Sequence, residues 1–454
     1  MSETLDRPAD ADEGKDERPP ITLFSRTTGR PQAPEPFGGS EAVAIEPDFE
    51  RFDQSNDMFC RGFWDPKVQT PMARKFFRSF VKPGERARDA DGFREQDYAI
   101  RNGPWVVTEM LAEMHKTRDR RDGFWDDFSP HIAPKVAPPA DPDPKALAGD
   151  VKRVAKLYGA DLVGVTAYDE RWTYASKYSA RTNACKPMEL PKGLKNVVVI
   201  AKSMDYDLIR TSPSATASTA PAIGYTHDAA LLLSLAQYIR SLGYQAVACQ
   251  NDTTLAIPYA IQAGLGELGR NSILITKEYG PRVRLGRVLT DMPLSHDAPK
   301  SFGVAKTCEI CRRCANNCPP QAIDHGPPTT YTHNVSNIKG VKKWTTDAEK
   351  CFKFWTSRGT DCGNCIRTCP YNKAGENWLH DVILRLLGTP FRRFALWLDD
   401  RLRLHDQVTP ESWWRGDRKR YKTVERAEDH KIDPEKVRQQ ERVKTIRLGK
   451  AKKS

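Results

Sequence analysis

Two cysteine runs near the end of this 454-residue chain constrain its structure more than any other feature. The first has the spacing Cys-x2-Cys-x2-Cys-x3-Cys-Pro, and the second has Cys-x10-Cys-x2-Cys-x3-Cys-Pro. The first spacing is the bacterial ferredoxin pattern, in which three thiolates hold one 4Fe–4S cube and the fourth crosses to the neighbouring cube. Zinc ribbons use paired Cys-x2-Cys knuckles instead. The two runs therefore predict a ferredoxin-like unit with two 4Fe–4S clusters.

The crossed pattern assigns each cysteine to one of the two clusters. The first cluster is predicted to bind Cys308, Cys311, Cys314 and Cys369. The second cluster is predicted to bind Cys318, Cys351, Cys362 and Cys365. The ten-residue gap after Cys351 departs from the plain ferredoxin spacing. The other cysteines, Cys60, Cys185 and Cys249, are expected to be small hydrophobic side chains rather than ligands.

The chain has no run of about 20 apolar residues, the length that a membrane-spanning helix needs. Its N-terminus is acidic and lacks the apolar segment of a secretory signal. We therefore expect a cytoplasmic protein that does not work with a membrane. In that reducing compartment, eleven cysteines indicate metal or redox chemistry rather than disulfides.

The formal net charge of +12 is concentrated at the C-terminus. Residues 415–454 contain 15 Lys or Arg and 7 Asp or Glu, which is two thirds of the excess. Such a segment can bind phosphate without sequence preference, but a solvated charged helix is the simpler interpretation. Nucleic acid is therefore not an expected partner.

Changes in composition divide the chain into six parts. The first three are a disordered lead-in at 1–40, an aromatic-rich N-terminal unit at 41–133 with a helix at 105–116, and a proline-rich linker at 134–149. The next three are an α+β core at 150–297, the ferredoxin-like two-cluster domain at 298–380 and a helical basic C-terminal tail at 381–454. Within the core, Thr226 is predicted to cap a helix that stops at Gly243.

Three segments of the core carry a resemblance to a known family. They are NDT at 251–253, AGLGELGR at 263–270 and EYGPRVRL at 278–285, and the two cysteine runs follow them. Over roughly residues 150–375 this order resembles the reductive dehalogenases, and the related epoxyqueuosine reductases share the same plan. The resemblance implies a nitroreductase-like core that holds cobalamin beside the nearer cluster. It also implies removal of halide from an organohalide, with electrons delivered through the clusters and a tyrosine as proton donor.

The resemblance implies roles for individual residues. The matching positions are Tyr225 as proton donor, Asn251 near the substrate and Arg284 as the cation that stabilises tyrosinate, with Arg282 as the alternative cation. A phenol has an unperturbed pKa of about 10, so a neighbouring cation makes it a better donor. The Gly-x-Gly-x-x-Gly segment lacks the strand–loop–helix context of a dinucleotide site. The predicted cofactor-binding residues are Trp344, Gly264, Gly266 and Gly269.

We expect an aromatic organohalide as substrate, because the aromatic-rich N-terminal unit is suited to cover the pocket. A separate ferredoxin, flavodoxin or reductase is the expected electron donor. One alternative is an epoxyqueuosine reductase-like tRNA-modifying enzyme, but that family places an aspartate acid where this chain has Gly224-Tyr225-Thr226-His227. A second alternative is a non-catalytic electron-transfer or corrinoid-binding protein, which would bind cobalamin without releasing halide.

Overall fold

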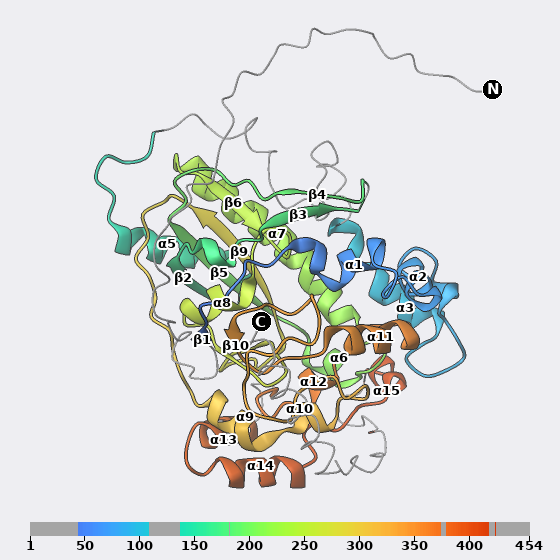
Figure 1. Ribbon diagram of the computed structural model, residues 1–454. Helices are drawn as coiled ribbons and strands as arrows, with labels where there is room; N and C mark the ends of the chain where they lie inside the picture. The colour runs from blue at the N-terminus through green and yellow to red at the C-terminus, as the bar shows by residue number, and fades with distance from the viewer. Residues whose placement is uncertain (1–43, 109–136, 181, 374–377, 417–422, 424–454) are drawn as a thin grey trace, which may run out of the picture.

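The computed structural model describes residues 44–108, 137–180, 182–373, 378–416 and 423 (Figure 1). The predicted lead-in, nearly all of residues 417–454 and most of the predicted helix at 105–116 lie outside the described residues. The part of that helix that is described is helical from Trp105 to Thr108.

A four-stranded antiparallel sheet forms the centre of the core. Its strand order is β2 (Leu162–Ala167), β5 (Asn196–Ser203), β9 (Val283–Thr290) and β6 (Ala246–Cys249). Ile200 of β5 lies opposite Val163 of β2 and Gly286 of β9. The run from Val197 to Ala201 is fully buried, so β5 is covered on both faces. Antiparallel strands combined with helices confirm the mixed helix-and-strand class predicted from the sequence.

Helices cover the two faces of this sheet (Figure 1). Side chains alternate between the faces of a strand, so neighbouring valines of β5 belong to different cores. Val198 packs with α5 (Pro144–Leu157) and α7 (Thr219–Ser241). Val197 packs on the other face with α8 (Ala256–Gln262).

The helix α7 begins earlier than the sequence predicted. Thr226 is not its cap but lies inside it, where its hydroxyl donates a hydrogen bond to the carbonyl oxygen of Pro104. Pro221 is the third residue of α7, a position in the first turn where proline is tolerated because its missing N–H has no helical partner. The predicted end is confirmed, because Leu242 closes the helix and Gly243 follows with a φ of 89°. The proline-rich linker is also shorter than predicted, since α5 begins at Pro144 with Asp143 as its N-cap.

The aromatic-rich N-terminal unit packs against the cluster-binding part of the chain, in accordance with its composition. Phe59 of α1 (Met58–Trp64) and Phe76 of α2 (Pro71–Arg78) each contact Phe352 of α11 (Ala348–Arg358), with ring centroids 5.7 and 6.0 Å apart. The unit also contains β1 (Ala44–Ile45), η1 (Gln54–Asn56), η2 (Pro83–Glu85) and α3 (Glu95–Asn102). β1 pairs with β10 (Val341–Lys342) of the two-cluster domain, and Phe49 contacts Trp172 of the core with ring centroids 5.5 Å apart, so the unit bridges both parts.

Short helices follow the sheet and carry the cysteine runs. They are α9 (Val304–Cys311), α10 (Arg313–Asn316) and α12 (Asn364–Arg367), together with α11. The chain then continues through α13 (Trp378–Leu387), α14 (Arg392–Arg401) and α15 (Pro410–Trp414). Smaller elements of the core are η5 (Glu170–Trp172), β3 (Ser176–Ser179), β4 (Ala184–Pro187), α6 (Tyr206–Arg210), β7 (Glu267–Leu268) and β8 (Leu274–Ile275). No helix within the described ranges is long and apolar enough to cross a membrane.

Candidate functional site

The eight cysteines of the two runs lie in two groups, each around its own cavity. A narrow cavity is lined by Cys308, Cys311, Cys314 and Cys369. A larger cavity of about 520 Å³ is lined by Cys318, Cys351, Cys362 and Cys365. The last cysteine of each run therefore lies with the other run. This is the grouping that the ferredoxin spacing predicts for two clusters.

The first group is closely enclosed by protein. Arg312, between α9 and α10, has a φ of 54°, and this left-handed turn changes the chain direction between Cys311 and Cys314. The backbone N–H of Arg270 lies 3.5 Å from the sulfur of Cys308 and donates to it. Burial raises the pKa of the Cys308 thiol to about 12. A thiol in such surroundings stays protonated unless a metal cation replaces its proton. The buried cysteines are therefore consistent with ligands to iron.

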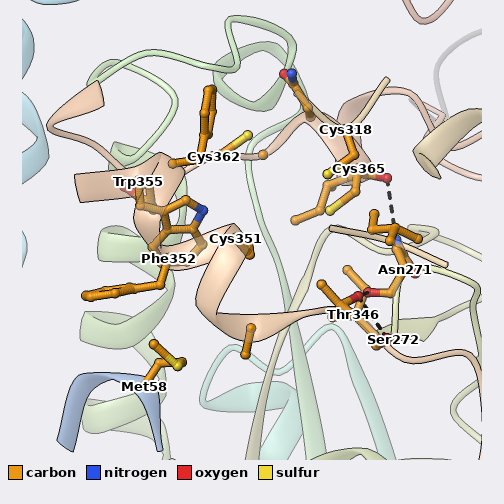
Figure 2. Close-up of a pocket in the computed structure, with 18 of the residues that line it drawn as sticks. Met58, Asn271, Ser272, Cys318, Thr346, Cys351, Phe352, Trp355, Cys362 and Cys365 are labelled. Atoms are coloured by element: carbon orange, nitrogen blue, oxygen red, sulfur yellow. Dashed lines mark hydrogen bonds between the residues drawn. The ribbon is translucent and has the colours of Figure 1, made fainter. Parts of the chain in front are cut away.

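The second group borders the larger cavity (Figure 2). Cys351 lies on α11 and Cys365 on α12, whereas Cys318 follows α10. Burial raises the pKa values of Cys351 and Cys362 to about 12. The N–H of Ala322 donates to the sulfur of Cys318 over 3.3 Å, a contact that would stabilise a thiolate. A cluster held by this group would therefore face the cavity directly.

The glycine-rich segment acts by packing rather than by lining the larger cavity. A Cβ atom placed on Gly264 would lie 2.4 Å from the carbonyl oxygen of Ala298, and one on Gly266 would lie 2.4 Å from that of Ile275. A Cβ on Gly269 would lie 2.5 Å from the Ile275 side chain. The segment leads directly to Arg270. None of the three glycines lines the larger cavity, and backbone or side-chain atoms pack closely against each of them. Their cofactor role stays a prediction.

Trp344 lies at the first cysteine group instead of at the larger cavity. It is 1% exposed and packs in one hydrophobic core with Cys308 and Cys369. Its ring lies 5.0 Å from the Arg270 guanidinium, and its indole N–H donates to Gly326. Trp344 thus packs beside the cysteines of the first predicted cluster, and its role in cofactor binding stays a prediction.

The larger cavity lies where three parts of the chain meet. The N-terminal unit contributes Met58 and Phe59, the cluster-binding part contributes Phe352 and Trp355, and the core contributes Arg284. Figure 2 shows Met58, Phe352 and Trp355 on one side of the cysteines and Asn271, Ser272 and Thr346 on the other. A volume of about 520 Å³ is within the usual range for small-molecule and cofactor sites.

Several buried polar atoms of the cavity-lining residues have no hydrogen-bond partner among the residues that the structure describes. The oxygen atoms among them are Ser212 Oγ, Asn271 Oδ1, Thr345 Oγ1 and Asn364 Oδ1. Buried polar groups are nearly always hydrogen-bonded in proteins, because an unmade bond costs free energy. The wall is therefore suited to a ligand that brings its own hydrogen-bonding groups.

Tyr225, Asn251 and Arg284 lie together although they are far apart in sequence. The side-chain amide of Asn251 donates to Oη of Tyr225 over 2.5 Å. The guanidinium of Arg284 lies 3.9 Å from the centroid of the Tyr225 ring. Gly224 makes this approach possible, since a Cβ there would be 2.4 Å from Cγ of Arg284. The structure thus brings together the three residues whose catalytic roles the resemblance implies.

Two neighbours hold Tyr225 in place. The side-chain amide of Gln250 donates to the backbone carbonyl of Tyr225 over 2.8 Å. The Trp105 ring lies with its centroid 4.7 Å from that of Tyr225. Trp105 was predicted only as part of an aromatic-rich unit, because nothing in its local sequence distinguishes it from the other aromatic residues there.

The structure separates the two arginines that the sequence left as alternatives. Arg282 donates to the backbone carbonyls of Met204 and Lys373 over 2.8 and 3.0 Å, and burial lowers its pKa. Arg284 instead contacts Tyr225 and also lines the larger cavity. Tyr225 and Asn251 do not line that cavity themselves, so Arg284 is the residue that connects them to it.

Asp228, one turn after Tyr225 on α7, was not predicted from the sequence. It is 1% exposed, and its Oδ1 atom has no hydrogen-bond partner among the described residues. Burial raises its pKa to about 7, although the positive charges of Arg284 and Arg287 act in the opposite direction. A single aspartate in a helix normally indicates a solvated face, so its sequence context gave no sign of this position.

Comparison with known proteins agrees with this geometry. Residues 307–372 match the family described as the 4Fe-4S double cluster binding domain. The chain is therefore a two-cluster iron–sulfur protein, and the predicted pair of 4Fe–4S clusters is confirmed.

The particular relatives are the reductive dehalogenases, as the sequence resemblance indicated. Over 290 residues the chain is 38% identical to the tetrachloroethene reductive dehalogenase of Desulfitobacterium hafniense, covering 54% of this chain and 52% of that protein. Its fold matches a catabolic reductive dehalogenase with a TM-score of 0.63 and 23% identity, over 83% of this chain and 49% of the other. An epoxyqueuosine reductase of Lactococcus garvieae (strain Lg2) is 27% identical over 139 residues, which are 27% of this chain and 34% of that protein. The chain thus spans about half the length of the curated dehalogenases that it matches.

Proposed function

We propose that the chain is a cobalamin-dependent reductive dehalogenase. The reaction consumes an organohalide, two electrons and one proton, and it yields the hydrogen-substituted carbon and a halide ion. The observation that carries the proposal is the group of Tyr225, Asn251 and Arg284, because Arg284 lines the same cavity as four cluster cysteines. A proton donor and an electron route therefore meet at one place.

The larger cavity fits a corrinoid in its chemistry. The amide groups around a corrin ring can bond the atoms of Ser212, Asn271 and Asn364 that have no partner among the described residues. Phe352 and Trp355 provide apolar surface for the ring. The resemblance to the reductive dehalogenases supports assigning the core to the nitroreductase-like class. Bound in this cavity, cobalamin would supply the reducing metal centre that removes the halogen.

The residues around Tyr225 would deliver the proton. Tyr225 donates from Oη, and Asn251 fixes the position of that oxygen. Arg284 stabilises the phenolate that remains after the proton leaves, because an opposite charge favours the ionised form of a phenol. A positioned general acid of this kind contributes about 10²- to 10⁴-fold to a rate.

The two clusters would act in a fixed order. The group with Cys351 lines the cavity, so it passes electrons to the site, and the group with Cys308 receives them first. We propose a separate ferredoxin, flavodoxin or reductase as donor. An aromatic substrate stays a prediction, and it is supported by the contact of the Trp105 ring with Tyr225. A cytoplasmic location also stays a prediction.

The test is anaerobic reconstitution with iron, sulfide and cobalamin, followed by assay of halide release from a panel of bromophenols with a chemical reductant. We expect the wild type to release halide and Tyr225→Phe to lose nearly all of this activity while it still binds cobalamin. Equal activity in both proteins would remove Tyr225 from the mechanism.

The same preparation tests the alternatives. Full cluster and cobalamin loading without halide release would contradict the proposal. Turnover of epoxyqueuosine-containing tRNA by that preparation would then favour the tRNA-modifying alternative, and no turnover of either substrate would favour a non-catalytic corrinoid protein.

A further inference from the structure

The larger cavity contains a lysine whose charge has no counterion in the described part of the chain. Lys343 lines the cavity, and its ammonium makes one weak hydrogen bond, 3.4 Å long, to the carbonyl oxygen of Ile338. No described carboxylate lies within ion-pair distance of it, and Asp324, which attracts it electrostatically, accepts a hydrogen bond from His333 over 3.0 Å. The cation is thus held beside the cavity without being paired.

Lys343 is half-buried, and the hydration that its ammonium loses makes this arrangement costly for the protein alone. This loss lowers the pKa of Lys343 to about 8, since a charged group loses hydration inside a protein. A buried charge is normally paired with an opposite charge or binds a ligand. An anionic group in the cavity would supply the missing partner.

Thr345 provides a second donor at the same place. It is 1% exposed, its hydroxyl has no hydrogen-bond partner among the described residues, and it lines the same cavity. Lys343 and Thr345 both line the larger cavity, whereas Trp344 between them packs toward Cys308. An ammonium next to a hydroxyl is a donor pair that suits phosphate oxygens.

The position of this donor pair separates it from the proton donor. Ile338, which accepts the Lys343 hydrogen bond, packs with the core on the α8 face of the sheet. Arg284 lies on the α7 face, because its stem packs on Gly224. Both cations line the cavity, and Arg284 is the one that contacts Tyr225. A substrate that reaches Tyr225 would lie beside Arg284.

We propose that Lys343 and Thr345 bind the phosphodiester in the nucleotide tail of the cofactor. This inference rests on the proposed function, because it assigns a subsite of the same cavity. Cobalamin is large enough to extend from the cluster cysteines toward Lys343, and its phosphodiester is the one group in its tail with a full negative charge. The donor pair would thus select corrinoids that carry a complete tail.

Corrinoid binding, rather than turnover, tests this proposal. The cluster-loaded full chain is titrated with cobalamin and with cobinamide, which lacks the phosphodiester and the base, and bound corrinoid is measured by ultrafiltration. The variants are Lys343→Gln, Lys343→Arg and Thr345→Val, with Lys342→Gln as the matched control on an exposed neighbour. We expect Lys343→Gln to weaken cobalamin binding about 10- to 100-fold, as for a lost charge-assisted hydrogen bond, and to leave cobinamide binding unchanged.

The other variants and outcomes distinguish a phosphodiester site from a structural role and from a substrate site. Lys343→Arg should retain most of the preference for cobalamin, Thr345→Val should lose part of it, and Lys342→Gln should match the wild type. Equal weakening of both corrinoids by Lys343→Gln would show a structural role and overturn the proposal. Unchanged cobalamin binding with a raised KM only for negatively charged organohalides would also overturn it, in favour of a substrate site. If the wild type bound neither corrinoid, the proposed function itself would be wrong.

Discussion

Asn251 donates a hydrogen bond of 2.5 Å to the phenolic oxygen of Tyr225. The contact joins the segment after β6 to the middle of α7, which are 26 residues apart in the chain. A phenolic oxygen both accepts and donates hydrogen bonds, and here it accepts one from the side-chain amide of Asn251. The hydroxyl hydrogen must therefore point away from Asn251. The Arg284 cation lies over the face of the ring. This geometry leaves the hydroxyl proton available for transfer to a substrate rather than to Asn251.

The first prediction concerns the phenol itself. Replacing Tyr225 with Phe keeps the ring between Trp105 and Arg284 but removes the transferable proton. Halide release should fall by about 100-fold or more, the usual contribution of a general acid. Tyr238→Phe, on the same helix, is the control and should keep wild-type activity. Loss of activity in both variants would indicate damage to α7 rather than loss of an acid.

The second prediction separates the roles of two arginines. Arg284→Met removes the charge at Tyr225 and should lower halide release about tenfold or more, because the phenolate is no longer stabilised. Its thermal stability should stay near that of the wild type. Arg282→Met removes two buried hydrogen bonds and should lower the unfolding free energy by about 2 kcal/mol or more. Activity per folded molecule and the melting temperature measure the two effects, and a reversed pattern would assign the catalytic cation to Arg282.

The sequence predicted the features that depend on short-range spacing or on a shared family pattern. The cysteine runs indicated two clusters because three ligands of each cube come from one short loop. The group of Tyr225, Asn251 and Arg284 was inferred from family resemblance alone, since these residues lie on α7, in the segment after β6 and on β9.

Features decided by tertiary packing could not be predicted in this way. The start of α7 was misplaced because Pro221 and Gly224 disfavour helix locally, whereas burial of Thr219, Ala220 and Ala222 stabilises it. The glycines at 264–269 allow neighbouring segments to pack closely, which their local sequence does not show. Asp228 and Lys343 have no local signature, because only the surrounding fold shows that they are buried or unpaired.

The third prediction tests the crossed cluster ligation by pairing substitutions. In the crossed arrangement Cys318 and Cys351 bind the same cluster, so the double variant Cys318→Ala/Cys351→Ala loses one cluster and keeps about four iron atoms. The matched variant Cys308→Ala/Cys318→Ala removes a ligand from each cluster and should keep almost no iron. Iron analysis after anaerobic reconstitution distinguishes the two. If each run held its own cluster, the iron contents of the two double variants would be exchanged.

The fourth prediction concerns the pH dependence of stability and rests on Asp228. Its folded pKa of about 7 lies above the ordinary 3.8, so the folded state holds this proton more tightly than the unfolded state does. The wild type therefore loses stability as the pH rises from about 4 to about 7, and the loss is complete above that range. A pKa difference of this size corresponds to at most about 4 kcal/mol.

Asp228→Asn cannot ionise, so its melting temperature should exceed that of the wild type at pH 8 by more than at pH 5.5. The exposed Asp150→Asn is the control and should follow the wild type at both pH values. A parallel pH dependence in wild type and Asp228→Asn would mean that other groups determine it.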